Sequence, residues 1–131
     1  MIVPVINFPG ICAEAQELYK KAFGMKVDSV AYYLDAPEGY MVFDEANKHY
    51  IMHSECSFYG IRVNMSDNTE GKIDGSLNFN VFLPTDDDVR AAFEIIKEGA
   101  TEIEELSPQF WTSLHGAAVD RFGVSWQIMT E

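Results

Sequence analysis

Two stretches decide the fold: residues 77–85 read LNFNVFLPT, and residues 2–10 read IVPVINFPG. In the first stretch, apolar residues at odd positions alternate with Asn78 and Asn80, which is the period-two pattern of a β-strand with one apolar face. Each stretch contains a proline that ends the apolar run, and a segment with helical spacing and then a glycine follows. The chain therefore repeats itself at an offset of 75 residues.

The segments after the two prolines predict helices with one buried face each, because their apolar residues follow i, i+3, i+4, i+7 spacing. The buried faces consist of Ala15, Leu18, Tyr19 and Ala22 in the first helix, and of Val89, Ala92, Phe93 and Ile96 in the second. Thr85 followed by Asp88 resembles a capping box at the start of the second helix. Gly24 and Gly99 stand where left-handed helix caps are expected.

Short β-rich segments separated by turn residues follow each helix and predict strands. The predicted strands lie near 26–34, 50–58 and 61–66 in the first half, and near 101–106, 116–119 and 125–129 in the second. The polar segment 67–74 is expected to connect the halves. A second offset, of 63 residues, makes Asn64 and Gln127 equivalent in the last strands.

This organisation predicts an α+β fold. Residues 1–131 form a single domain of two βαβββ modules, about 1–67 and about 75–131, arranged as a half-open barrel with a pocket between them.

Composition excludes several classes of partner. The chain has 131 residues, 9 basic and 21 acidic, and a formal charge of -12 without a basic cluster, which argues against nucleic acid and against an anionic membrane surface. No secretory signal or membrane-spanning apolar stretch is present, so we expect a cytoplasmic protein. Cys12 and Cys56 have neither CxxC spacing nor a secretory context and are interpreted as reduced thiols.

Several side chains are candidates for a site. Asn78 and Asn80 alternate with core residues and predict a lined, partly wet cavity; the alternative is a solvent-exposed sheet face. His53 and Glu55 share one face of a strand, so they suit general acid–base catalysis or a hydrogen-bonded structural pair.

The segment around Trp111 and His115 predicts a loop that closes over the cavity, with Phe110 and Trp111 as an apolar wall; core or dimer packing is the alternative. Trp126 alternates with Gln127 and is interpreted as core.

The chain resembles a known family. The segments that carry the likeness are VINFPGICAEAQELYKKAFG (5–24), YIMHSEC (50–56), MSD (65–67) and FWTSLHGAAVDRFGVSW (110–126). They are similar to the PhnB-like branch of the vicinal oxygen chelate superfamily, which includes glyoxalase I, bleomycin and fosfomycin resistance proteins and extradiol dioxygenases. The resemblance implies the glyoxalase/bleomycin resistance-like fold and a homodimer.

Enzymes of that superfamily typically hold a divalent metal with His and Glu from the first and last strands of each module. The matching positions here are about Val3, Asn78, Asn64 and Gln127. A shift of register to Val5, Asn80, Met65 and Ile128 supplies no better ligands. Because catalytic divalent sites use imidazole or carboxylate ligands, we predict no metal and no other cofactor.

The sequence therefore favours a PhnB-like protein that binds a small molecule without the usual metal site. The predicted ligand-binding residues are Asn64, Asn78, Asn80, Trp111, His115 and Gln127, and the predicted catalytic residues are His53 and Glu55. The alternative is a glyoxalase-type lyase or isomerase that uses a divalent metal or acid–base catalysis. A 3-demethylubiquinone 3-methyltransferase-like activity is the third hypothesis, against which stands the absence of a glycine-rich loop after a parallel strand.

Overall fold

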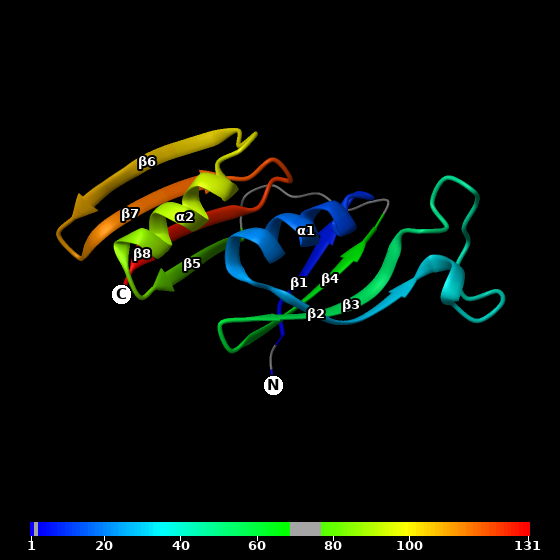
Figure 1. The fold of residues 1–131 in the computed structure, drawn as a ribbon. Helices are drawn as coiled ribbons and strands as arrows, with labels where there is room; N and C mark the ends of the chain where they lie inside the picture. The colour runs from blue at the N-terminus through cyan, green and yellow to red at the C-terminus, as the bar shows by residue number, and fades with distance from the viewer. Residues whose placement is uncertain (2, 69–76) are drawn as a thin grey trace. The chain divides into compact units, whose positions relative to one another are not determined.

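The structure, a computed structural model, describes residue 1, residues 3–68 and residues 77–131 (Figure 1). Its elements are β1 (Val5–Phe8), α1 (Cys12–Phe23), β2 (Lys26–Tyr32), the short 3-10 helix η1 (Tyr33–Asp35), β3 (Ile51–Phe58), β4 (Ile61–Asp67), β5 (Asn78–Leu83), α2 (Asp86–Ile96), β6 (Glu102–Gln109), β7 (Thr112–Val119) and β8 (Ser125–Thr130). Each half has the predicted βαβββ order. No helix in the described ranges is long and apolar enough to cross a membrane.

The described chain forms two compact units with one sheet each. The first comprises the described residues of 1–20 and 24–72, and the second those of 21–23 and 73–131. The sheet orders are β1-β4-β3-β2 and β5-β8-β7-β6. The α+β fold of two repeated modules is confirmed.

The first and last strands of each module pair in parallel, and all other strand pairs are antiparallel. Val5 pairs with Asn64 in the first sheet, and Asn80 pairs with Gln127 in the second. These two pairs are related by the offsets of 75 and 63 residues that the sequence predicts. The structure therefore confirms both offsets, because the first and last strands pair in the same register in the two sheets.

The helices differ from each other at their ends. Gly24 ends α1 in the left-handed region as predicted, with φ 64°. The Thr85 hydroxyl accepts the Asp88 backbone N–H and caps α2, which confirms the predicted start. The prediction for Gly99 is corrected, because α2 ends at a right-handed cap, Lys97, and Gly99 takes its positive φ of 72° two residues later.

Several predicted boundaries are wrong. The strand β2 stops at Tyr32 because the chain turns into η1, and Asp67 is the buried last residue of β4 and not part of a connecting loop. The predicted loop around Trp111 and His115 is a β-hairpin, since only Phe110 and Trp111 turn between β6 and β7. The rest of the predicted connection, residues 69–74, lies outside the described residues, as do Ile2 and Ser76.

One face of each sheet packs on the helix of its module, and the other, called the open face below, carries the alternate side chains. Val81 and Leu83 are buried, whereas Asn78, Asn80 and Phe82 are exposed. The predicted helix faces are buried except for Ala22, which is half-buried. Within the second unit the asparagines therefore line an exposed sheet face, which is the alternative considered above.

The D-x-FG-x-x-W segment has a structural explanation. Asp120 is fully buried, and its Oδ1 accepts the backbone N–H groups of Phe122 (2.8 Å) and Val124 (3.1 Å). Its Oδ2 accepts the indole N–H of Trp126 at 2.9 Å. Trp126 is fully buried, which confirms it as core, and stacks on Phe79. The segment thus fixes the β7–β8 turn.

We predict that Asp120→Ala lowers the free energy of unfolding by about 2–4 kcal/mol, because buried N–H donors lose a charged acceptor. Urea unfolding measures this change. Asp87→Ala is the control, since its exposed pair with Arg90 is expected to contribute about 0.5 kcal/mol or less. Equal changes in the two variants would contradict the assignment.

Candidate functional site

The open face of the second sheet carries three rows of side chains, one residue from each strand. The first row is Phe82, Met129, His115 and Ser107; the second is Asn80, Gln127, Ala117 and Glu104; the third is Asn78, Ser125, Val119 and Glu102. Four of the six predicted ligand-binding residues thus lie on this face, and a fifth, Trp111, stands at the turn beside His115.

His115 is the unusual member of the first row. Only 4% of its surface is exposed, and its Nε2 lies 2.9 Å from Oε1 of Gln127. Because Oε1 is an acceptor, Nε2 is the donor in this pair, and in the tautomer that carries its proton on Nε2 the Nδ1 atom is an acceptor. Among the described residues Nδ1 has no hydrogen-bond partner. The ring of Trp111, which is half-exposed, lies edge-on to the imidazole with 5.7 Å between centroids.

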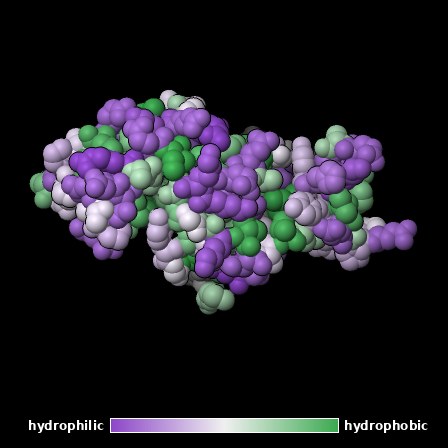
Figure 2. Space-filling model, in the orientation of Figure 1, coloured by the Kyte–Doolittle hydropathy of each residue, from purple (hydrophilic) through white to green (hydrophobic). Residues whose placement is uncertain are grey.

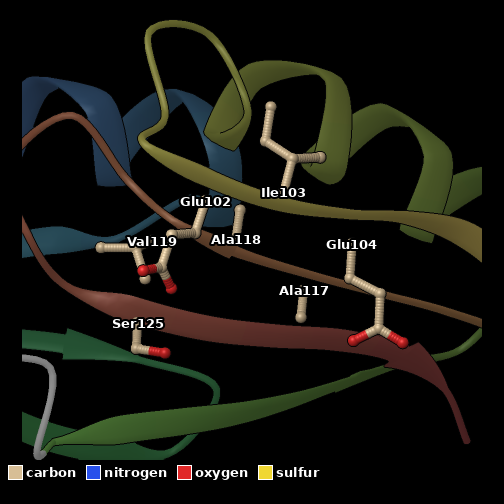
Figure 3. Close-up of a pocket in the computed structure, with 7 residues that line it drawn as sticks. All are labelled: Glu102, Ile103, Glu104, Ala117, Ala118, Val119 and Ser125. Atoms are coloured by element: carbon tan, nitrogen blue, oxygen red, sulfur yellow. The ribbon is translucent and has the colours of Figure 1, made fainter.

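A shallow cavity of about 230 Å³ lies over the second and third rows. It is surrounded by the side chains of Glu102, Glu104, Val119 and Ser125 (Figure 3). Ala117 lies at its base, where the small methyl side chain leaves space for the cavity. In Figure 3 the side chains of Ile103 and Ala118 point to the opposite side of the sheet. Two exposed carboxylates therefore border the cavity on the β6 edge.

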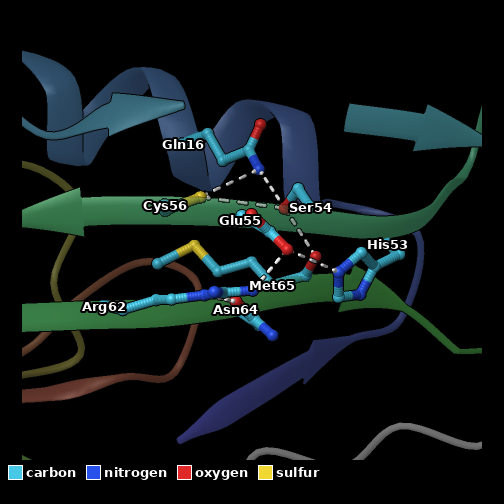
Figure 4. A network of polar contacts seen from close by, with 8 residues as sticks. All are labelled: Gln16, His53, Ser54, Glu55, Cys56, Arg62, Asn64 and Met65. Carbon is cyan, nitrogen blue, oxygen red and sulfur yellow. Dashed lines mark hydrogen bonds and ion pairs between the residues drawn. The ribbon is translucent and has the colours of Figure 1, made fainter. Parts of the chain in front are cut away.

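The open face of the first sheet is more polar. The guanidinium of Arg62 donates to Glu55 Oε1 through Nη2 and to Asn64 Oδ1 through Nε at 3.2 Å (Figure 4). His53 Nε2 lies 3.9 Å from the same Glu55 oxygen. The structure thus brings together the predicted pair His53 and Glu55 and adds Arg62 and Asn64 to it.

The two histidines occupy equivalent places in the repeat. Glu55 pairs with Asn64, and Ala117 pairs with Gln127, so Glu55 and Ala117 are counterparts. His53 and His115 stand two residues before them on the same faces. The half-buried, charged network of the first unit therefore corresponds in the second unit to a buried histidine, His115, near the small side chain of Ala117.

A larger cavity, of about 410 Å³, lies in the first unit under the connection between β2 and β3. Its lining consists of Asn7, Tyr33, Tyr40, Met41, Val42, Asn47, Met52, Ser66, Asp67 and Asn68. None of these residues is among the predicted site residues. The sequence feature that could have indicated this cavity is the apolar run Tyr40–Phe43, which lies in a segment without a strand or helix pattern.

Comparisons with known proteins identify the family. The model of the Glyoxalase/Bleomycin resistance protein/Dioxygenase superfamily matches residues 8–128. The chain belongs to this superfamily. A search of curated protein sequences found no match.

Solved structures share the fold over the whole chain. Protein PA1353 from Pseudomonas aeruginosa is 27% identical with a TM-score of 0.84, covering 100% of this chain and 97% of that one. The PhnB protein from Bacillus cereus, whose name carries a provisional 3-demethylubiquinone-9 3-methyltransferase assignment, is 17% identical with a TM-score of 0.83 and coverages of 99% and 98%. The bleomycin resistance determinant of transposon Tn5 is 12% identical with a TM-score of 0.56 and coverages of 100% and 97%.

The residues at the superfamily's metal positions do not fit a catalytic divalent metal. The sequence places these positions at about Val3, Asn78, Asn64 and Gln127; in the structure Asn64 pairs with Val5 and Gln127 pairs with Asn80. One aliphatic side chain and three neutral amides lack the imidazole and carboxylate donors that such metals require. In the described ranges no three His, Cys, Asp or Glu side chains gather into a metal-binding group.

The cysteines are buried on the helix side of the first sheet. Burial raises the pKa of both the Cys12 and the Cys56 thiol, and the nearby Asp67 carboxylate raises the pKa of Cys12 further. Gln16 Nε2 donates to Ser54 Oγ at 2.8 Å and lies 3.6 Å from Cys56 Sγ (Figure 4). Neutral, enclosed thiols are poor nucleophiles, so this network is structural.

We predict that neither cysteine reacts with a disulfide reagent such as DTNB in the native protein at mildly alkaline pH, because raised pKa values keep both thiols protonated. Both should react when guanidinium unfolds the chain. Absorbance of the released thiolate measures the reaction. Rapid labelling of one native thiol would contradict the structural assignment.

Proposed function

We propose that this protein binds a small organic molecule on the open face of its second sheet, around His115 and Trp111, without a bound metal. The observation that carries the proposal is the buried Nδ1 of His115, which has no partner among the described residues. A buried acceptor without a donor costs about 1–3 kcal/mol, and a ligand N–H or O–H recovers that free energy.

The neighbouring side chains suit the same ligand. Trp111 offers half of its surface as a flat apolar contact, and its place in a two-residue turn leaves the indole room to move aside from the imidazole. Gln127 fixes the tautomer of His115, while the exposed amides of Asn78 and Asn80 provide further hydrogen bonds on the same face. The ligand in this proposal is planar and carries a hydrogen-bond donor.

Asn64 lies in the first unit and not on the sheet that carries His115, and its Oδ1 accepts a hydrogen bond from Arg62. Its remaining amide donors are available to a ligand on that face. The homodimer and the cytoplasmic location stay predictions.

The acid–base alternative rests on the contact between His53 and Glu55. Both side chains are accessible, with exposed fractions of 50% and 38%, and they lie close enough to share a proton through one water molecule. Arg62 already engages the Glu55 carboxylate, which favours an ion-pair role for Glu55. The methyltransferase alternative would require a glycine-rich loop after a parallel strand. The turn after β1 has a single glycine, Gly10, and the Tyr50 side chain fills the space beside it.

Benzimidazole and 1-methylbenzimidazole test the donor requirement, because methylation removes the N–H and keeps the ring. We predict that benzimidazole binds about fivefold to tenfold more tightly, and that His115→Phe abolishes this difference. Ligand titrations followed by NMR of the protein measure both affinities. His53→Phe, the same change at the equivalent position of the first sheet, is the control and should leave the difference intact. Equal affinities of the two compounds for the unmodified protein would overturn the proposal.

We predict that protein purified without chelator contains far less than one equivalent of Zn, Ni, Mn or Fe, because the amide positions lack suitable donors. Elemental analysis by mass spectrometry measures the metal content. Benzimidazole binding should also survive dialysis against EDTA. Near-stoichiometric metal that EDTA removes together with binding would favour the glyoxalase-type alternative.

A further inference from the structure

We propose a second binding site in the first unit: the cavity of about 410 Å³ under the β2–β3 connection, which takes an uncharged small molecule with an acceptor oxygen and an apolar part. Cavities of this size are typical of small-molecule sites. The described residues that line it all belong to the first unit, so the inference does not depend on the His115 region.

The connection that covers the cavity is held in place by its own hydrogen bonds. Tyr33 N–H donates to the Tyr50 carbonyl at 2.9 Å, and Leu34 N–H donates to the Lys48 carbonyl at 3.1 Å. The Oδ1 atom of Asn47 accepts the Asp44 backbone N–H at 2.7 Å, and the Asp44 carboxylate in turn accepts from Asn47 N–H. The cavity therefore has a preformed wall.

The floor of the cavity is set by the ends of β1 and β4. Ser66 Oγ donates to Asn7 Oδ1 at 2.7 Å, which orients the Asn7 amide. The Tyr33 hydroxyl donates to the Asp67 carbonyl at 2.9 Å and is thereby occupied. Asp67 is 6% exposed, and its two carboxylate oxygens accept the backbone N–H groups of Cys12 and Ile51.

Two amide groups remain without acceptors in the described part of the chain. The oxygens of Asn7 and Asn47 are engaged, and neither Nδ2 group donates to another described residue. An N–H₂ group in this arrangement recognises a carbonyl, ether or hydroxyl oxygen. The polar part of the ligand is therefore an acceptor.

The remaining lining explains the apolar part of the ligand. Val42 is 95% exposed and Tyr40 is 71% exposed on the wall of the cavity, and hydrophobic side chains are visible at this end of the first unit in Figure 2. Met41 and Met52 add flexible side chains that adapt to a ligand's shape. An apolar group in the cavity removes this surface from water.

The charge of the lining favours a neutral ligand. Among the described residues that line the cavity there is no Lys or Arg to hold an anion, and the chain as a whole carries a charge of -12. Among the described lining residues, the Asp67 carboxylate is the group that would attract a cation, but it is buried and hydrogen-bonded to two backbone N–H groups.

Acetophenone and cumene form the matched probes, because they share a ring and a branched substituent and only acetophenone has a carbonyl acceptor. We expect acetophenone to shift the side-chain amide NMR signals of Asn7 and Asn47 and to bind about fivefold more tightly than cumene. Asn47→Asp keeps the oxygen that accepts from Asp44 and removes the donor, so it should weaken acetophenone binding about fivefold with little change in thermal stability.

Gln109→Glu makes the same amide-to-carboxylate change on β6 of the second unit and is the control that should leave acetophenone binding unchanged. Asn7→Asp is the second variant and should weaken binding as Asn47→Asp does. Unchanged amide signals, or equal affinity in both Asp variants and the unmodified protein, would overturn the inference. The benzimidazole difference at His115 should persist in Asn47→Asp, so failure of one site is distinguishable from failure of the other.

Discussion

The parallel pairing of the first and last strand in each module is the constraint on which the rest of the structure depends. A parallel neighbour cannot be reached by a tight turn, so the chain must cross over through a helix and return through antiparallel strands. The pairs Val5–Asn64 and Asn80–Gln127 fix the register of each sheet. Because side chains alternate along a strand, that register also decides which residues pack on the helix and which form the open face.

This dependence explains how much could be predicted from the sequence. Alternation and helical spacing survive small errors in element boundaries, so the modules, both offsets, the helix cores and the burial of Trp126 were predicted correctly. The same alternation placed Asn80 and Gln127 on one face, because each is separated from the core residues of its strand by one position. Side-chain periodicity carries this information within a single strand.

What could not be predicted depends on contacts between distant segments. His115 was expected in a loop together with Phe110 and Trp111, yet β6 and β7 form a hairpin in which only Phe110 and Trp111 turn. The cavity under the β2–β3 connection is lined by Tyr33 and Asp67, which are 34 residues apart and are joined by a hydrogen bond from the Tyr33 hydroxyl to the Asp67 carbonyl. A local pattern of hydrophobicity cannot predict such a contact between distant residues.

The two open faces differ although the two registers agree. Core residues are constrained by packing against their helix, since even small changes of volume are unfavourable there, whereas side chains on an open face lack that constraint. At equivalent positions Glu55 meets Arg62 in an ion pair, and Ala117 leaves room for a cavity. The histidine beside Glu55 is half-exposed, while its counterpart His115 is buried and held by Gln127. A repeated backbone therefore presents two chemically different surfaces.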